Sequence, residues 1–412
     1  MKKKIMIGSL IAVAIISSIL IYIFMIKGNK KETIIYEDGT IDQNIKIVDE
    51  LNIEYGTIRH LSDYISIKGG KLKDVKIEYN DLGEKKVKFS YELDNVKYYK
   101  YLTFNIVDTT APYVSVPSYK TIDINREITF IEDFFCGDNY DKNVERHLEG
   151  DFELGKVGTY YVKYVATDKS GNKTEKNMTL NIVEQITPSG NNNNNNEINY
   201  IDYSTLYNEY KNKNTKVGID ISRWQGDVDF DKLKENNVEF IMIRLGGQDG
   251  VDGDYYIDSK FEQNIKGALE KGFDVGVYFY SYAHTKEEAV KQAKYVIKNL
   301  KGYKITLPIV FDWECWNKFN QFGISFYDVT EVQKSFLDYV ESKGYTASRY
   351  GSKHYLNNAW QETEHLTWLA HYTSNTDYEG DYFMWQRCDT GKVPGIYGAV
   401  DVDVLYLDKY NL

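Results

Sequence analysis

Two acidic residues, Asp312 and Glu314, stand at the end of the apolar run 307–311, whose sequence Leu-Pro-Ile-Val-Phe is typical of a buried strand. Because side chains alternate faces along a strand, both carboxylates point the same way, with Cα atoms roughly 6 to 7 Å apart. Two carboxylates beside an apolar wall can perform glycoside hydrolysis, since burial raises the pKa of one acid while its neighbour stays ionised. A calcium ligand pair and a solvated strand end are the alternatives for this short motif.

The composition narrows the classes of function. The chain has 412 residues, 42% of them hydrophobic and 15% aromatic, which is enough for two or three packed domains. Its formal net charge of −11 offers no broad positive field for a phosphate backbone, so nucleic acid is not expected as a partner. Three cysteines are too few for a disulfide scaffold, and neither cysteine nor histidine spacing matches a zinc motif. The sequence therefore predicts no metal and no cofactor.

The N-terminal segment has the pattern of a membrane anchor. Lysines at positions 2–4 precede residues 5–26, an uncharged stretch that would span roughly 33 Å as a helix, about one hydrocarbon core. Bulky residues continue up to Lys27, which favours an uncleaved anchor over a signal peptide with a small-residue cleavage site. The basic residues place this end in the cytoplasm. We therefore expect residues 1–30 to form a basic tip and a single transmembrane anchor, with the rest of the chain outside.

Short alternating runs rich in Val, Ile, Tyr and Thr follow, which predicts two β-sandwich modules at residues 31–108 and 109–185. Their motifs recur at an offset of 72 to 76 residues, about one small sandwich per repeat. The joint 108–112 and the turn 166–172, Ala-Thr-Asp-Lys-Ser-Gly-Asn, resemble immunoglobulin-like modules of bacterial surface proteins, well in the second module and weakly in the first. Asp133, Asp138 and Asp141 could bind calcium, although a solvated loop is the preferred interpretation.

Residues 186–215 have the composition of a flexible linker. Six consecutive asparagines at 191–196 cannot bury apolar surface. Within the same region, residues 199–211 place Tyr203, Leu206 and Tyr210 near helical spacing, so a short amphipathic helix is possible there.

The C-terminal half, residues 216–412, alternates strand-like apolar runs with helical patterns, which implies parallel strand pairing. Capping boxes precede two of the helices, Thr285 with Glu288 and Thr330 with Gln333. The strand-like runs lie at residues 217–221, 240–244, 275–279, 307–311, 345–350, 366–370, 382–386 and 400–404.

About eight such runs indicate a closed α/β barrel, TIM-like but irregular in its last units, where the connections look too short for full helices. Active sites in such barrels lie at the C-terminal ends of the strands. Asp312 and Glu314 fall at one of these ends.

Several motifs of this barrel region occur together and in a fixed order. They are Val-Gly-Ile-Asp-Ile-Ser-Arg-Trp-Gln-Gly at 217–226, Tyr-Phe-Tyr at 278–280, Phe-Asp-Trp-Glu at 311–314, Trp-Leu-Ala-His-Tyr at 368–372, Trp-Gln at 385–386 and Val-Asp at 400–401. Over residues 217–412 they resemble the motifs of glycoside hydrolase family 25. The members of that family are secreted muramidases, or lysozymes. The resemblance therefore implies cleavage of the β-1,4 bond between N-acetylmuramic acid and N-acetylglucosamine in peptidoglycan.

The resemblance also implies roles for four acids. Glu314 resembles the general acid that protonates the departing glycosidic oxygen, and Asp312 the carboxylate that steers the acetamido group or stabilises the oxocarbenium-like transition state. Asp220 and Asp401 resemble the third and fourth acids of the site. Like-charge repulsion and partial burial are expected to keep Glu314 protonated near neutral pH. The stereochemical course, retaining or inverting, stays open.

A sugar-binding groove is implied by the same resemblance, since pyranose faces carry CH groups that pack on aromatic rings. The Gln386 amide is expected to hydrogen-bond a carbohydrate substituent. Filling of the barrel is the alternative role for each aromatic residue. The expected aromatic walls are Tyr278, Tyr280, Trp368, Tyr372 and Trp385.

One residue departs from the family pattern, and two cysteines lie next to its motifs. Asp403 stands where asparagine is common, and one more negative charge would disfavour ionisation of Glu314 and shift the pH optimum upward. Cys315 adjoins Glu314, and Cys388 lies two residues after Gln386. These cysteines either are buried and inert or form a disulfide.

The sequence therefore predicts a multidomain protein with a transmembrane helix, two all-β immunoglobulin-like sandwiches and a catalytic barrel. We expect its partners to be peptidoglycan glycan strands, with cutting confined to the cell wall near the membrane. Such cutting would suit wall remodelling, or a passage for a wall-spanning secretion or conjugation apparatus. The alternatives are a glycosidase for another amino-sugar polymer and an inactive, lectin-like wall-binding or adhesive surface protein.

Overall fold

The computed structural model describes residues 44–48, 51–79, 81–94, 96–186 and 199–410. These residues fall into two compact units that divide between Thr109 and Thr110. Within the described part of the chain, no helix is both long and apolar enough to cross a membrane. The predicted anchor lies outside these residues and stays a prediction.

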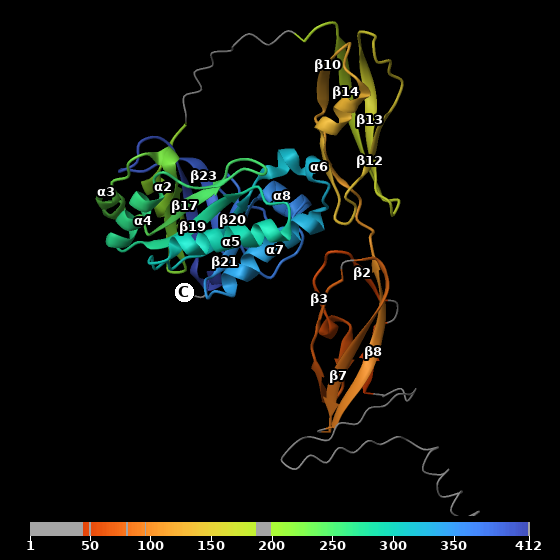
Figure 1. Cartoon of the computed structure of the whole chain (residues 1–412), viewed down its shortest axis with the longest axis horizontal. Helices are drawn as coiled ribbons and strands as arrows, with labels where there is room; N and C mark the ends of the chain where they lie inside the picture. Colours follow the sequence, from red (N-terminus) through yellow and green to blue (C-terminus); the bar gives the residue numbers. More distant parts are fainter. Residues whose placement is uncertain (1–43, 49–50, 80, 95, 187–198, 411–412) are drawn as a thin grey trace, which may run out of the picture. The chain divides into compact units, whose positions relative to one another are not determined.

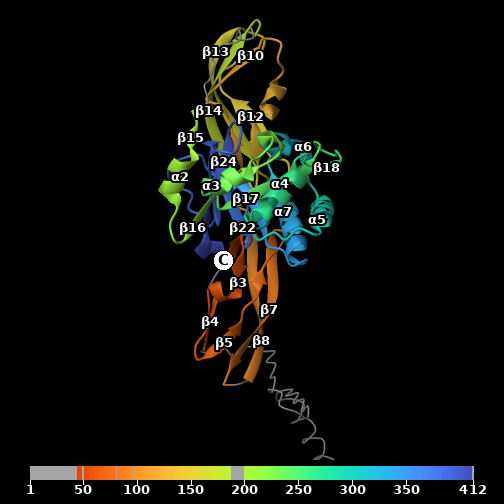
Figure 2. The same ribbon diagram turned by 90° about the vertical axis from the view of Figure 1, so that its left-hand side faces the viewer.

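The first unit is built from β-strands, as the sequence predicts. Its four-stranded sheet has the order β2-β8-β7-β5 and is centred on the long β7–β8 hairpin (Figure 1 and Figure 2), with Phe89, Leu102 and Phe104 buried in its core. Strand β2 runs parallel to β8, whereas the other two pairings are antiparallel. The elements are β1 (Ile45–Ile47), β2 (Asn52–Glu54), β3 (Arg59–His60), η1 (Leu61–Asp63), β4 (Ile65–Ile67), β5 (Gly70–Lys73), β6 (Lys76–Ile77), β7 (Gly83–Leu93) and β8 (Val96–Val107).

Residues 113–183 form a second β-module, which belongs to the second unit. Its sheet has the order β10-β14-β13-β12 with β10 parallel to β14, the same arrangement as in the first unit, in agreement with the predicted repeat. An immunoglobulin-like identity of either module stays a prediction. The elements are β9 (Tyr113–Ser115), β10 (Tyr119–Asp123), η2 (Ile128–Asp133), β11 (Phe135–Gly137), β12 (Glu145–Glu149), β13 (Gly158–Thr167) and β14 (Lys173–Val183).

Two of the three acids considered for calcium are buried in a loop of this module. Asp138 Oδ1 accepts the backbone N–H groups of Tyr140 and Asp141 at 2.8 and 2.7 Å. Asp141 Oδ2 accepts the N–H of Lys169 at 2.6 Å. Asp133 is exposed and forms an ion pair with Arg126 instead. Asp138 and Asp141 therefore hold the loop backbone, and the prediction of a solvated loop is wrong for them.

The barrel has eight strands and closes where β24 pairs with both β16 and β23. Neighbours from β16 to β23 are parallel, as predicted, but β24 is antiparallel to both of its neighbours. The short connection 393–399 explains this, because a parallel pairing needs a longer crossover. The strands are β16 (Thr215–Ile221), β17 (Phe240–Gln248), β19 (Asp274–Ser281), β20 (Ile309–Trp313), β21 (Ala347–Ser352), β22 (Leu366–Ala370), β23 (Met384–Lys392) and β24 (Val400–Tyr406), with β15 (Ile201–Asp202) and β18 (Tyr255–Ile257) added at β23 and β17.

Helices cover the outside of the barrel, where α5 and α7 pack against each other (Figure 1). Helix α5 begins at the predicted capping box, with Thr285 accepting the N–H of Glu288. Helix α7 begins five residues earlier than predicted, at a box of Ser325 and Asp328, so the prediction at Thr330 was wrong. The helices are α2 (Tyr203–Tyr210), η3 (Arg223–Gln225), α3 (Phe230–Glu235), α4 (Phe261–Glu270), α5 (Lys286–Leu300), η4 (Cys315–Lys318), α6 (Phe319–Phe322), α7 (Phe326–Glu341), α8 (Lys353–Asn358) and α9 (Leu407–Tyr410).

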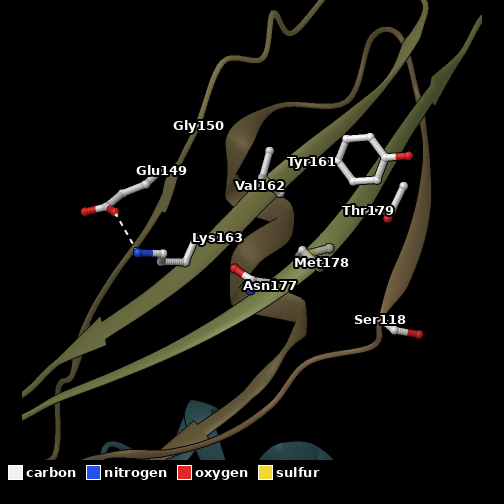
Figure 3. Close-up of a pocket in the computed structure, with 9 residues that line it drawn as sticks. All are labelled: Ser118, Glu149, Gly150, Tyr161, Val162, Lys163, Asn177, Met178 and Thr179. Carbon is white, nitrogen blue, oxygen red and sulfur yellow. Dashed lines mark ion pairs between the residues drawn. The ribbon is translucent and has the colours of Figure 1, made fainter.

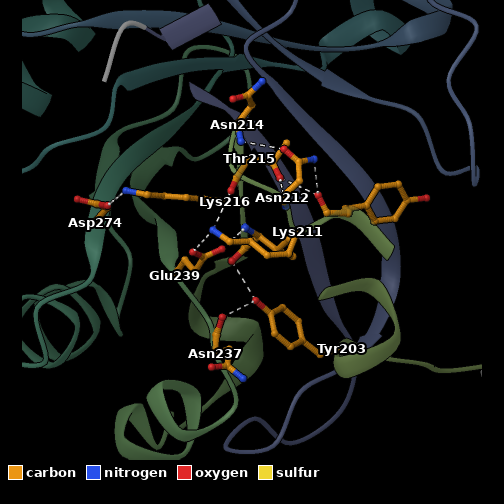
Figure 4. Close-up of polar contacts among 11 residues, drawn as sticks. Tyr203, Lys211, Asn212, Asn214, Thr215, Lys216, Asn237, Glu239 and Asp274 are labelled. Atoms are coloured by element: carbon orange, nitrogen blue, oxygen red, sulfur yellow. Dashed lines mark hydrogen bonds and ion pairs between the residues drawn. The ribbon is translucent and has the colours of Figure 1, made fainter. Parts of the chain in front are cut away.

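Helix α2 and the chain after it, assigned to the flexible linker by the sequence, pack on the barrel (Figure 4). Tyr203 is buried, and its hydroxyl donates to the carbonyls of Val217 and Asn237 at 2.9 and 3.2 Å. Lys211 pairs with Glu239 at 2.5 Å. The amphipathic spacing at 199–211 therefore marks the first helix of the barrel domain, which begins before residue 216.

Strand alternation sorts the barrel side chains into two layers. Outward residues such as Ile219 and Phe311 pack beneath the helices. Inward residues near the amino ends of the parallel strands, such as Met242, Val310 and Leu405, form a separate apolar cluster. This cluster fills the lower part of the barrel, so only its carboxyl end is open for a polar site.

Candidate active site

The inward positions above the apolar layer surround a pocket of about 250 Å³ at the carboxyl end of the parallel strands. All of the predicted catalytic and substrate-binding residues except Trp385 line it. The lining residues are Asp220, Ser222, Trp224, Gln225, Arg244, Tyr278, Tyr280, Asp312, Glu314, Tyr350, Trp368, Tyr372, Gln386 and Asp401.

Asp401 reaches the pocket because β24 runs against its neighbours. It lies at the start of β24 and pairs in register with Asp220, which lies near the end of β16. The start of an antiparallel strand and the ends of parallel strands meet at the same edge. A parallel β24 would have placed Asp401 at the opposite end of the barrel, away from the other acids.

Asp312 and Glu314 differ in exposure. Asp312 is buried, and its Oδ1 has no hydrogen-bond partner among the described residues, whereas Glu314 follows the last residue of β20 and opens to solvent at the pocket mouth. Burial and the neighbouring Glu314 charge raise the pKa of Asp312 well above its usual range. Burial by the pocket walls also raises the pKa of Glu314, against the hydrogen bond from Asp312 and the charge of Arg244. Both carboxyls therefore keep their protons to higher pH than isolated acidic side chains do.

Arg244, which the sequence did not predict as a site residue, is a cation among these acids. Its guanidinium lies 5.0 Å from the centroid of the Tyr280 ring and donates to the Tyr256 hydroxyl at 2.6 Å. Its charge opposes the raised pKa of both Asp312 and Glu314. A signal was present, because Arg244 ends an apolar strand as Asp312 does.

Gln386 holds the other side of the pocket together. Its Nε2 donates to Asp220 Oδ2 at 2.8 Å, and its Oε1 accepts the hydroxyls of Tyr350 and Tyr372 at 2.9 and 3.0 Å. The amide oxygen is thus engaged by protein groups. Gln386 therefore orients Asp220 and two tyrosines, and its hydrogen bond to a carbohydrate substituent stays a prediction.

Burial of Asp220 raises its pKa to about 6, while hydrogen bonds with Gln386, Asp403 and Tyr278 limit the rise. Burial, with the charge of Asp220, raises the pKa of Asp401 to about 9. Near neutral pH, Asp220 is therefore mainly ionised and Asp401 mainly protonated. Their environments separate acids that look alike in the sequence.

The aromatic residues form a floor and a rim. Trp368 is only 2% exposed and packs edge-to-face on Tyr278 at 6.1 Å, so these rings close the pocket from below. Tyr372 is 51% exposed and Trp224 is 72% exposed. Trp224 belongs to the motif at 217–226, but its exposure on the one-turn η3 could not be inferred from sequence. The exposed platforms for a sugar ring are Tyr372 and Trp224.

The prediction that Trp385 forms a sugar-binding wall is wrong. Trp385 neighbours inward-facing Gln386 on β23, and adjacent residues on a strand face opposite ways. Its Nε1 donates to the carbonyl of His371 at 2.8 Å, and its ring meets Tyr210 of α2 at 5.5 Å. Trp385 therefore fastens α2 to the outside of the barrel.

Cys315 and Cys388 are buried free thiols. Burial raises the pKa of both, that of Cys315 to about 11. The disulfide considered from the sequence is not formed, and both thiols are unreactive near neutral pH.

Asp403 lies beneath the pocket, fully buried, and accepts the Trp368 Nε1 proton at 2.9 Å. Burial, with the charges of Asp220 and Asp401, raises its pKa well above the usual range. The pKa of Glu314 responds to burial, to Asp312 and to Arg244, and Asp403 is not among the groups that shift it. On these contacts we do not expect Asp403 to raise the pH optimum, contrary to the hypothesis drawn from the sequence.

Replacing Asp403 with asparagine should leave the pH–rate profile in place and raise thermal stability. An acid whose pKa is raised on folding contributes full stability below its unfolded pKa and loses it as pH rises towards the folded pKa. Asparagine does not titrate and keeps the oxygen that accepts from Trp368. We expect a melting temperature about 2 to 4 °C higher at pH 8, and no difference near pH 4. Scanning calorimetry should be run on the same samples as the rate measurements. A lower pH optimum in Asp403→Asn than in wild type would show that Asp403 does raise the optimum, as the sequence suggested.

One other pocket and two surface clusters of the described residues lack this arrangement. The pocket on the sheet of the second β-module has one carboxylate in its lining, Glu149, which lies 3.8 Å from Lys163 (Figure 3). Two surface clusters bring possible metal ligands within 4.8 Å of one another, and neither contributes to the pocket of the barrel. These clusters are Asp252, His284 and Glu288, and Asp338, Glu341 and His365.

Curated relatives are similar to this chain over slightly less than half of its length. An autolytic lysozyme of Clostridium acetobutylicum is 29% identical over 189 residues, 45% of this chain and 54% of that protein. Lysozyme M1 of Streptomyces globisporus is 25% identical over 202 residues, 45% of this chain and 65% of that protein. The chain thus spans about half the length of the first relative.

Several solved structures are similar to this chain. One is the modular autolysin LytC from Streptococcus pneumoniae, which is 25% identical with a TM-score of 0.42, and the match covers 59% of this chain and 56% of that one. A family 25 glycosyl hydrolase from Bacillus anthracis is 21% identical with a TM-score of 0.42, covering 49% and 95%. Residues 219–396 match the family model described as glycosyl hydrolases family 25. The C-terminal half of this chain therefore carries a glycosyl hydrolase family 25 domain.

Proposed function

We propose that this chain is a lysozyme-type peptidoglycan hydrolase, which cleaves the β-1,4 bond between N-acetylmuramic acid and N-acetylglucosamine. The main support is the acidic pocket at the carboxyl end of the barrel, in which the exposed Glu314 lies beside the buried Asp312. The family 25 match and the lysozymes among its relatives support the substrate.

Glu314 is the general acid of this proposal. Its raised pKa lets it reach a bound glycan with a proton to give to the departing glycosidic oxygen. Positive charge then develops on the sugar ring, where the ionised carboxylate of Asp220, held by Gln386, stabilises it together with Asp312. The rim residues Tyr372 and Trp224 pack on flanking sugar faces.

The test is the release of reducing ends from purified peptidoglycan by the full chain, with mass spectrometry of the fragments. Fragments that end in N-acetylmuramic acid support a muramidase. Fragments that end in N-acetylglucosamine would assign a different bond, and binding to the wall without any release would support the lectin-like alternative.

We also propose that residues 5–26 anchor the enzyme in the cell membrane and confine cutting to the nearby wall. The support is the uncharged stretch after a basic tip, followed by two β-modules and an asparagine-rich segment that give the domain reach. Membrane fractionation with an antibody against the barrel tests this. The full-length chain should sediment with the membrane, and a shortened soluble species would contradict an uncleaved anchor.

A further inference from the structure

The tip of the second β-module contacts the barrel next to the proposed catalytic acid. Phe135 of β11 places its ring among four aromatic residues of the barrel domain, with centroid separations from 5.7 to 6.0 Å. We call this contact the Phe135 interface. The four barrel rings belong to Trp316, Phe319, Phe326 and Tyr355.

Backbone hydrogen bonds fix the two surfaces in one register. The first N–H groups of a helix have no partner within the helix. In α7, the N–H of Phe326 donates to the carbonyl of Asp138 in the module at 2.7 Å. Asn320 Nδ2 donates to the carbonyl of Phe134 at 3.0 Å. The module thus supplies an acceptor for the first N–H group of α7 and another for the side chain of Asn320 in α6.

Gly137 shows how closely the surfaces approach. A Cβ atom at this position would lie 2.4 Å from Cε1 of Phe326 and 2.7 Å from Cε1 of Phe319. No side chain fits there without moving an aromatic ring of the barrel. The interface therefore depends on glycine at 137 and on a large ring at 135.

Part of the barrel side of the interface is η4, which directly follows Glu314. Trp316, in η4, donates its backbone N–H to the carbonyl of Glu314 at 2.8 Å. Its indole stacks on Tyr355 at 4.2 Å and meets Trp313 edge-on at 4.7 Å. Phe135 covers the same indole edge-on, at 6.0 Å. The backbone that carries Glu314 is thus held between the barrel strand and the β-module.

We propose that the second β-module is a positioning element of the catalytic site, in which Phe135 holds η4 and thereby fixes Glu314 against Asp312. The proposal rests on the proposed function, because it assigns Glu314 the proton transfer. Phe135 is a positioning residue, since it acts through Trp316 and does not line the pocket. A loose η4 would leave Glu314 more solvated and less well aligned with a bound glycan.

The experiment compares full-length wild type with Phe135→Ala and Phe135→Leu on a short soluble peptidoglycan oligosaccharide. For Phe135→Ala we expect kcat to fall at least about 10-fold with KM changed less than about 3-fold, because misalignment affects the reaction more than binding. The basic limb of the pH–rate profile should move to lower pH, since solvation favours the Glu314 carboxylate. Leucine, which retains an apolar side chain, should restore most of kcat.

Two further variants make the result specific. Gly137→Ala adds a methyl group from the module side and should reproduce the loss of kcat without altering Phe135. Tyr161→Ala removes an aromatic ring that is 82% exposed on the sheet of the same module and should leave kcat and pH profile unchanged. Near-ultraviolet circular dichroism checks that each variant is folded.

The outcomes separate this proposal from the proposed function. If wild type releases reducing ends and both Phe135→Ala and Gly137→Ala keep its kcat and pH profile, the positioning role is overturned and the proposed function stands. A change confined to KM would also overturn it, because the module would then act in binding. Absence of release by wild type would overturn the proposed function and this proposal with it.

Discussion

Replacing Glu314 with glutamine should lower kcat/KM for peptidoglycan cleavage at least about 10³-fold, the range expected on losing a general acid. Glutamine has nearly the same shape but no proton to give to the glycosidic oxygen. Glu314 opens to solvent at the pocket mouth, so the change buries no new unsatisfied group and should not unfold the domain. The measurement is the initial rate of reducing-end release by the full chain across pH 4 to 9.

A matched control is Glu270→Gln, the same chemical change at an exposed position on α4. It should retain the wild-type rate. The Glu314→Gln protein should still sediment with purified walls, because Tyr372 and Trp224 remain. Residual activity within 10-fold of wild type would remove Glu314 as the general acid and direct attention to Asp312.

The alternation of strand side chains made much of the site predictable from the sequence. Asp312, Asp220 and Tyr278 each lie on the inward face of an apolar strand, where a buried charge or hydroxyl is costly unless it has a hydrogen-bond partner or a chemical role. The helix at Thr285 was predictable because its capping box lies directly before an apolar stripe. At Ser325 the same signal was overlooked, since Thr330 offers a similar spacing inside the helix.

Other features depend on distant contacts that a single sequence does not display. The antiparallel direction of β24 follows from a short connection and decides whether Asp401 joins the site. Adjacent Trp385 and Gln386 both looked suitable for sugar binding, but only one face of β23 points inward. The raised pKa of Asp403 arises from complete burial beneath two other acids, which composition and spacing cannot reveal.

Replacing Asp312 with asparagine should lower kcat/KM about 10²-fold and move the basic limb of the pH–rate profile to lower pH. The rate falls because asparagine cannot ionise, so it cannot supply the negative charge that Asp312 gains beside the developing cation once the pair has given its proton to the glycan. The limb moves because the last proton of the Asp312–Glu314 pair leaves only when two neighbouring negative charges are formed, which holds it to higher pH. In the variant, ionisation of Glu314 creates one charge, opposite Arg244, so the acid loses its proton earlier.

The pH profile of this variant tests whether the two carboxyls titrate as a pair. Asp252→Asn is a suitable control, because Asp252 is exposed outside the pocket and has a φ of 60°, which asparagine tolerates. It should keep both the rate and the basic limb of wild type. An unchanged basic limb in Asp312→Asn would mean that Glu314 holds its proton through burial by the pocket walls alone. Asp312 would then act only on the developing charge of the sugar, and the two acids would contribute independently to the barrier.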